Sequence, residues 1–167
     1  MTGAEKAAWL ASFITESWEV LDRRPCQERV ISRAVAFCEA REAAFDATHA
    51  VLVHGDAHAH NALRDPREPG AFKLVDPDGL LAEPACDLAV PMREWSGELL
   101  TAADPAAAAQ ARCGTLSRLT GVPRQPIWEW GFMERVSTGL LLFSLGREQE
   151  GRLMLDVADM VAGIETA

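Results

Sequence analysis

The chain has 167 residues, of which 49% are hydrophobic, and its formal net charge is −9. This length predicts a single domain over residues 1–167 with a sizeable core. The excess of acidic residues argues against a nucleic-acid-binding surface and suits a cationic small-molecule partner. The longest apolar run, residues 139–145, is far shorter than the roughly 20 residues that span a bilayer, so no membrane partner is expected.

The cysteines and the first residues point to a cytoplasmic protein. The four cysteines show no CxxC pair and no metal-ligand spacing, so we predict reduced and mostly buried thiols: Cys26, Cys38, Cys86 and Cys113. The opening residues Met-Thr-Gly-Ala-Glu-Lys lack a basic region followed by an apolar one, so no signal peptide is expected.

Two helices are expected before residue 50. Residues 4–21 carry large apolar side chains at helical spacing, namely Trp9, Leu10, Phe13, Ile14, Val20 and Leu21. Pro25 restricts the residue before it and should separate this helix from the next one. The second helix is predicted over residues 27–45, with its inward side formed by Val30, Ile31, Ala34, Val35, Cys38 and Phe45.

A short apolar strand followed by a dense polar loop comes next. Residues 51–53 are predicted to be the strand, and residues 54–61 the loop. The composition of residues 65–70 predicts a turn, which would pair a short strand at 62–64 with another at 72–75. The polar loop would then lie beside a small β-hairpin.

The remainder of the sequence is predicted to be helical. Pro84 suits the first turn of a helix that reaches about residue 95 and that Pro91 should kink or interrupt. Asp104 and Pro105 form a good start for a helix over 105–120. Two more helices are expected, over residues 126–145 in the core and residues 149–163. The predicted fold class is therefore α+β and mostly helical.

The polar loop contains the residue types that phosphoryl transfer requires. His54, Asp56 and Asn61 follow the first strand, and Asp76 follows a later one. In this chemistry one carboxylate orients the attacking hydroxyl and accepts its proton, while an Asn and a second Asp hold magnesium on the nucleotide phosphates. Magnesium prefers oxygen ligands, which Asn61 and Asp76 provide.

Three motifs, in this order, resemble the aminoglycoside phosphotransferases, which have a protein-kinase-like fold. They are His54-Gly-Asp-Ala-His-Ala-His-Asn61, Val75-Asp-Pro-Asp-Gly79 and Glu83-Pro-Ala-Cys-Asp-Leu-Ala89. The chain looks most similar to the branch that contains streptomycin 6-kinases and hydroxyurea phosphotransferases. The resemblance implies the C-terminal lobe of that fold, in which a small β-hairpin carries the catalytic loop.

The resemblance also implies a role for individual residues. Asp56 corresponds to the catalytic base, and Asn61 and Asp76 correspond to the Mg²⁺ ligands. His54 and Asp87 match residues that support the catalytic loop. Two further residues of the motifs have possible roles that stay open, His58 and Asp78. The implied donor is ATP, and the implied acceptor is an alcohol group of an aminoglycoside such as streptomycin.

One large part of the family pattern is missing from the sequence. The family has an N-terminal lobe with a nucleotide-covering loop and a strand lysine, whereas this chain has no glycine-rich loop and only Lys6 and Lys73. The expectation is a C-terminal lobe alone, with Met1 where the second lobe of the family begins. Such a lobe would bind nucleotide weakly and would expose an apolar surface to an N-terminal lobe or to a second copy of the chain.

Two other functions remain open. A lone kinase lobe could be a binding module that holds a ligand without turnover. Asp56, His58 and His60 also resemble the start of a metal-dependent hydrolase barrel, although such a barrel needs about 250 residues and further ligands.

Four residues in the C-terminal half of the chain each allow a structural or a ligand-binding interpretation. Trp128 and Trp130 are expected in the core rather than in an acceptor pocket. Glu129 and Glu134 are expected on a solvated helix face rather than against a polycationic sugar.

Overall fold

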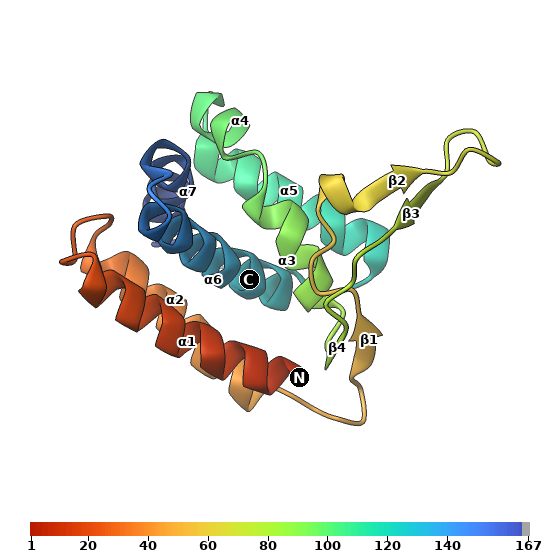
Figure 1. The fold of residues 1–167 in the computed structure, drawn as a ribbon, viewed down its shortest axis with the longest axis horizontal. Helices are drawn as coiled ribbons and strands as arrows, with labels where there is room; N and C mark the ends of the chain where they lie inside the picture. Colours follow the sequence, from red (N-terminus) through yellow and green to blue (C-terminus); the bar gives the residue numbers. More distant parts are fainter. Residues whose placement is uncertain (165–167) are drawn as a thin grey trace.

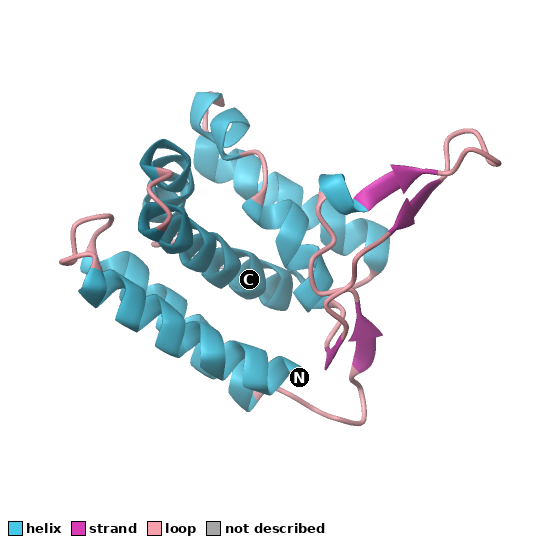
Figure 2. Ribbon diagram, in the orientation of Figure 1, coloured by secondary structure: helices cyan, strands magenta, loops and turns pink. Residues whose placement is uncertain are grey.

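The computed structural model describes residues 1–164 and shows a mostly helical α+β fold (Figures 1 and 2). Helices α1 (Gly3–Val20) and α2 (Glu28–Ala43) pack side by side at one side of the molecule. A capping box begins α1, because Thr2 Oγ1 accepts from the Glu5 N–H at 3.2 Å and the Glu5 carboxylate accepts from the Thr2 N–H at 2.7 Å. Both helices lie within two residues of their predicted bounds.

Four short strands form two separate antiparallel pairs. Strand β1 (Val51–Val53) pairs with β4 (Leu80–Ala82), and β2 (Ala62–Arg64) pairs with β3 (Phe72–Leu74). The β2–β3 hairpin was predicted, and it extends away from the helices in Figure 1. The pairing of β1 with β4 was not predicted. This pairing brings together the two ends of residues 54–79, the segment that carries the polar loop.

Within the described residues, five helices follow the strands. They are α3 (Ala85–Arg93), α4 (Ser96–Thr101), α5 (Pro105–Thr120), α6 (Arg124–Ser144) and α7 (Glu148–Val161). The structure differs from the predicted helix over residues 84–95 in two ways. Helix α3 continues through Pro91 to Arg93 without interruption, and a separate short helix, α4, begins at Ser96 after Trp95 adopts a left-handed conformation with φ of 54°. The Asp104 cap of α5 is present, since its Oδ1 accepts from the Ala107 N–H at 2.9 Å.

Helix α6 lies at the centre of the helices and contributes more buried residues than any other described helix (Figure 1). Its side chains are buried continuously from Ile127 to Ser137, including both tryptophans. The predicted core position is therefore confirmed, but its most buried part precedes residues 139–145, where Leu141 is 43% exposed. Helix α3 crosses α6 so closely at Gly131 that an added Cβ would lie 2.5 Å from the Met92 Cβ.

Only some of the apolar side chains that predict α1 face the core. Ala7, Leu10, Ile14 and Trp18 are buried, whereas Trp9 is 57% exposed and Val20 is 80% exposed. No helix among residues 1–164 combines the length and the apolar character needed to cross a membrane.

Candidate functional site

The polar loop is fixed at its start by a carboxylate from α3. Asp87 accepts two backbone hydrogen bonds, from the His54 N–H at 2.8 Å and from the Gly55 N–H at 2.7 Å. Hydrogen bonds to a charged acceptor are stronger than neutral ones. Asp87 lies in the first turn of α3, so this helix sets the direction in which the loop leaves β1.

Gly55 is needed at the sharp bend of the loop. Its φ is +88°, which disfavours any residue with a Cβ. An added Cβ would also lie 2.6 Å from Leu80 Cδ2 and 3.0 Å from Asp78 Cβ. The bend therefore packs directly against β4 and against the Asp78 side chain.

His54 connects the loop to the end of the hairpin. Its Nδ1 accepts from the Asp56 N–H at 3.3 Å, so its Nε2 carries the proton and donates to the Val75 carbonyl at 3.0 Å. Both ring nitrogens are used within the fold, which gives His54 a supporting position rather than one open to a ligand.

Asp56 points into an open cleft and contacts two other side chains. Its Oδ1 accepts from Arg93 Nη2 at 2.8 Å, and its Oδ2 lies 3.2 Å from His58 Nε2. The side chain remains 32% exposed. Arg93, from the last turn of α3, was not among the predicted site residues.

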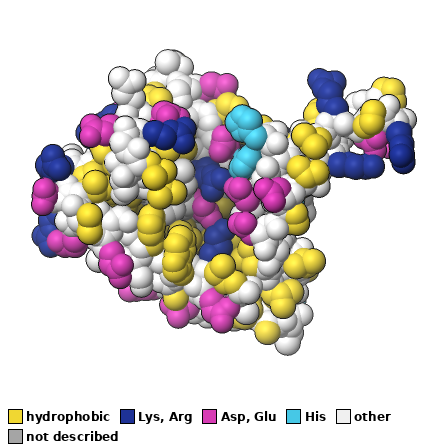
Figure 3. All heavy atoms as spheres, in the orientation of Figure 1, with side chains coloured by type: hydrophobic (Ala, Val, Ile, Leu, Met, Phe, Trp, Pro, Cys, Tyr) yellow, Lys and Arg dark blue, Asp and Glu magenta, His cyan; other side chains and the backbone are white. Residues whose placement is uncertain are grey.

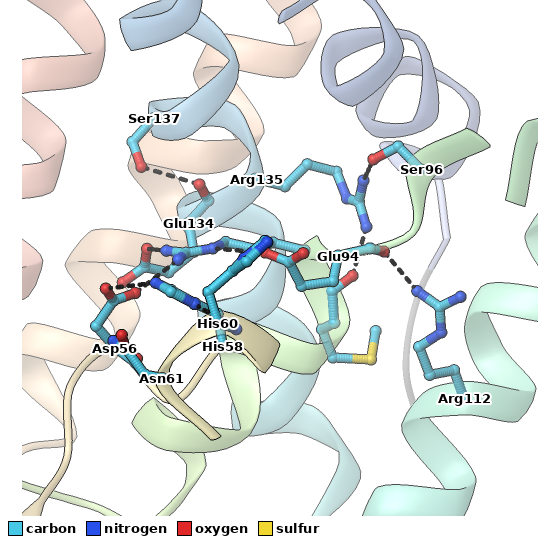
Figure 4. Close-up of polar contacts among 12 residues, drawn as sticks. Asp56, His58, His60, Asn61, Glu94, Ser96, Arg112, Glu134, Arg135 and Ser137 are labelled. Carbon is cyan, nitrogen blue, oxygen red and sulfur yellow. Dashed lines mark hydrogen bonds and ion pairs between the residues drawn. The ribbon is translucent and has the colours of Figure 1, made fainter. Parts of the chain in front are cut away.

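A chain of alternating charges continues from Asp56 into the core. Arg93 Nη1 donates to Glu134 at 2.9 Å, and the other oxygen of Glu134 lies 2.6 Å from Lys6 Nζ. Figure 4 shows Asp56 and Glu134 turned toward each other with a guanidinium between them. Burial alone would lower the pKa of Lys6, but Glu134 overcomes this effect and the pKa of Lys6 is raised.

The expectation that Glu129 and Glu134 are solvated is wrong. Both side chains are at least 94% buried, and each is neutralised by a cation from a distant helix. Glu129 lies 2.6 Å from Arg41 Nε of α2. Buried carboxylates require such partners because desolvation of an unpaired charge is very costly.

Asn61 is hydrogen-bonded to Val75, the residue before Asp76, at the base of the hairpin. The side-chain N–H of Asn61 donates to the backbone carbonyl of Asp56 at 3.0 Å. The backbone carbonyl of Asn61 accepts from the Val75 N–H at 2.9 Å. Asp76 follows directly, is exposed and has a left-handed φ of 59°. Within residues 1–164, no hydrogen bond occupies the side-chain oxygen of Asn61 and no ion pair occupies the Asp76 carboxylate.

Asn61 and Asp76 carry side-chain oxygens of the kind that magnesium prefers. Magnesium usually keeps several waters and takes only one or two protein carboxylates or amides plus substrate phosphates. The free oxygens of Asn61 and Asp76 supply ligands of this kind. Asp78, two residues further on, is exposed, and its Cβ lies close to Gly55.

The cleft in front of Asp56 has a volume of about 410 Å³. It is bounded by the loop, α1, the end of α3 and α6, and its wall includes Lys6, Trp9, Phe13, Asp78, Arg93 and Glu134. Figure 3 shows this face, where hydrophobic side chains over α1 lie beside acidic, basic and histidine side chains. An open cleft beside a partly exposed carboxylate is a suitable place for a small-molecule ligand.

The geometry offers little to a metal-dependent hydrolase. The rings of His58 and His60 lie edge to face with centroids 5.6 Å apart, and His60 is exposed. Among the described residues, no three His, Cys, Asp or Glu side chains are grouped closely enough to hold a metal ion. A zinc site needs three or four such ligands, so the Asp56, His58 and His60 pattern does not form one here.

Comparisons of the chain with models of protein families, with curated proteins and with solved structures gave no match.

Proposed function

We propose that this chain is the C-terminal lobe of a phosphotransferase with a protein-kinase-like fold. The reaction is the transfer of the ATP γ-phosphoryl group to an alcohol group of an aminoglycoside such as streptomycin, as in antibiotic resistance. The observation that carries the proposal is the arrangement around Asp56. Its carboxylate faces an open cleft, Asn61 is hydrogen-bonded to its backbone, and the strand end bearing Asp76 is hydrogen-bonded to Asn61.

Each residue has a defined task in this reaction. Asp56 orients the acceptor hydroxyl and accepts its proton, while Asp87 and His54 hold the loop that presents Asp56. Asn61 and Asp76 would hold Mg²⁺, which neutralises charge on the ATP phosphates when it is bound. His58 contacts the second oxygen of Asp56 and so restricts the orientation of this carboxylate.

The nucleotide clamps of such an enzyme come from outside this set of residues. An N-terminal lobe, or a second copy of the chain, would cover the strands and close over the phosphates. Catalysis in this class consists mainly of positioning and electrostatic stabilisation, so turnover by the chain alone should be slow.

A transfer assay tests the proposal. The chain would be incubated with Mg²⁺, streptomycin and ATP labelled at the γ-phosphate, and labelled streptomycin would be measured. We expect slow transfer that Asp56→Asn abolishes. Asp156→Asn, the same change at an exposed position on α7, should leave it unchanged. Transfer that is equal in the Asp56→Asn variant would show that Asp56 is not the base.

Two contacts of Asp56 favour a second candidate function, a binding module without turnover. Both carboxylate oxygens of Asp56 already contact a side chain, Arg93 on one and His58 on the other. A reacting hydroxyl would have to share an oxygen with one of them. If streptomycin binds to the chain but no label is transferred at any ATP concentration, this second function is the better account.

A further inference from the structure

A small cavity lies where helices α3, α4, α5, α6 and α7 meet. Its walls are mostly apolar, and α6 contributes two side chains with N–H groups, Trp128 and Arg135. Its volume of about 20 Å³ is enough for one water-sized species, since a water molecule needs about 10–15 Å³. The cavity shares no wall residue with the cleft beside Asp56, so it is a separate site.

The indole N–H of Trp128 needs an acceptor. Trp128 is only 2% exposed, and its Nε1 has no hydrogen-bond partner among residues 1–164. The two other buried tryptophans have one: Trp130 donates to Glu83 at 2.8 Å, and Trp18 donates to the Cys26 carbonyl at 3.4 Å. A buried donor left unpaired is costly, so such a group calls for a bound partner.

The buried guanidinium of Arg135 needs a negative charge. Arg135 is 3% exposed and donates to the Ser96 hydroxyl and to the Met92 carbonyl, which are both uncharged. A guanidinium has five N–H donors, so these two bonds leave donors for a further acceptor. No carboxylate of residues 1–164 forms an ion pair with Arg135, although burial of an unpaired charge is very unfavourable.

The charge around Arg135 is positive. Arg112 donates to the Glu94 carbonyl at 2.8 Å, and Figure 4 shows the side chains of Arg112 and Arg135 reaching the same segment. Burial and Arg112 lower the pKa of Arg135 to about 9, so Arg135 is charged at neutral pH. The Glu94 carboxylate opposes this lowering least strongly of the three causes, and its Oε1 also lies 3.7 Å from Arg93 Nε. This environment favours an anion over a neutral ligand.

We propose that the cavity binds one small monovalent anion such as chloride, held by the indole N–H of Trp128 and by the guanidinium of Arg135. An anion supplies both an acceptor and a negative charge, whereas a water molecule supplies only the acceptor. Phosphate and sulfate are too large for a cavity of about 20 Å³.

This site lies outside the proposed phosphotransfer reaction, but it is connected to the end of α3. The Met92 carbonyl that accepts from Arg135 directly precedes Arg93, whose Nη2 donates to Asp56. The bound ion would therefore fix the turn of α3 from which Arg93 reaches Asp56.

Urea denaturation at neutral pH tests the proposal. Sodium chloride would replace sodium methanesulfonate at constant ionic strength, because methanesulfonate is too large for the cavity. We expect a saturable stabilisation, in which the ratio of unfolded to folded protein falls about tenfold when chloride reaches ten times its dissociation constant.

Three variants assign this effect to the cavity. Trp128→Phe removes the N–H but keeps an aromatic ring, and it should weaken chloride binding at least about tenfold, as for loss of a hydrogen bond to a charged group. Arg135→Met should abolish the chloride effect. Trp18→Phe is the control, because Trp18 is also buried but does not line the cavity, and this variant should keep the full chloride effect. If Arg135→Met does not fold, the comparison of Trp128→Phe with Trp18→Phe decides.

Diffraction from crystals of the wild-type chain grown in sodium bromide locates the ion directly. The expected result is an anomalous bromide peak within hydrogen-bond distance of Trp128 Nε1 and of the Arg135 guanidinium. Three results would overturn the proposal: stability that does not depend on chloride, a chloride effect that is unchanged in Trp128→Phe, or no bromide peak in the cavity. In each case the cavity would be a water site.

Discussion

At the residue scale, one carboxylate determines whether the loop bearing Asp56 keeps its shape. Asp87 accepts hydrogen bonds from two consecutive backbone N–H groups, at 2.8 and 2.7 Å. Removing it would leave both donors without a partner, and each unpaired buried donor costs about 1–3 kcal/mol. Few single side chains outside the core should matter as much for stability.

We predict that Asp87→Ala lowers the free energy of unfolding by about 2–4 kcal/mol, measured by urea denaturation. Asp104→Ala is the control, since Asp104 accepts only one such bond, from the Ala107 N–H at the start of α5. That variant should lose about 1 kcal/mol, as for a typical helix cap. Equal losses in the two variants would show that Asp87 does not support the loop in this way.

The sequence predicted the local residues of the candidate site but not the distant ones. Asp56 and Asn61 could be predicted because a loop motif places both within a few positions of a strand end. Lys6 and Arg93 lie on helices far from the loop in sequence, and only the packed fold brings them to Asp56. Glu134 gave one usable signal, because it interrupts a run of apolar side chains on α6.

At the element scale, a buried arginine holds the junction between α3 and α4. Arg135, on α6, is 3% exposed and donates to the Met92 carbonyl and to Ser96 Oγ (Figure 4). Arg112 donates to the Glu94 carbonyl of the same junction at 2.8 Å. Burial and the neighbouring Arg112 lower the pKa of Arg135 to about 9, because no carboxylate of the described residues forms an ion pair with it.

This environment predicts an unusual pH dependence of stability. In the unfolded chain an arginine keeps its proton to a much higher pH than Arg135 does in the folded protein, so above about pH 9 the unfolded state binds more protons than the folded state. The contribution of Arg135 to the free energy of unfolding therefore increases as the pH rises through about 9. The reason is that the folded protein then loses the buried positive charge, which is unfavourable.

Comparison with Arg135→Met isolates this contribution. Urea denaturation at several pH values should show the wild type gaining stability relative to the variant as the pH rises through about 9. A difference between the two proteins that stays constant over this range would mean that Arg135 titrates as in water.

The elements that were not predicted from the sequence are those whose formation depends on contacts between residues far apart in the chain. The long helices have a clear apolar periodicity, so their bounds were predicted closely. Strand β4 has only three residues and exists because β1 pairs with it. Helix α4 has six residues and starts from the junction that Arg135 and Arg112 hold, which no local pattern reveals.

At the scale of the whole molecule, the short strands expose several large apolar side chains. Leu52 and Leu81 lie opposite each other on β1 and β4 and are 76% and 51% exposed. On the projecting hairpin, Phe72 is 58% exposed. Exposed apolar surface that spans several elements commonly marks an interface.

We predict that the purified chain associates with itself through the β1–β4 strands. Sedimentation velocity should show an average mass that rises with protein concentration. Leu52→Glu should reduce this association, because a buried leucine contributes about 1.5–3 kcal/mol to an interface and a buried unpaired carboxylate opposes it. Val20→Glu is the control, since Val20 is 80% exposed on α1 and lies away from the strands. A monomer at every concentration would exclude self-association through this face.

The most direct test of the central claim is a calorimetric titration of the chain with ATP, in the presence of Mg²⁺ and then of a chelator. The account predicts binding that requires Mg²⁺ and that weakens at least about tenfold in Asn61→Ala and in Asp76→Ala, since each change removes one of the two proposed metal ligands. ATP binding that is unaffected by the chelator and by both substitutions, or no binding at all, would contradict the assignment of this loop to phosphoryl transfer.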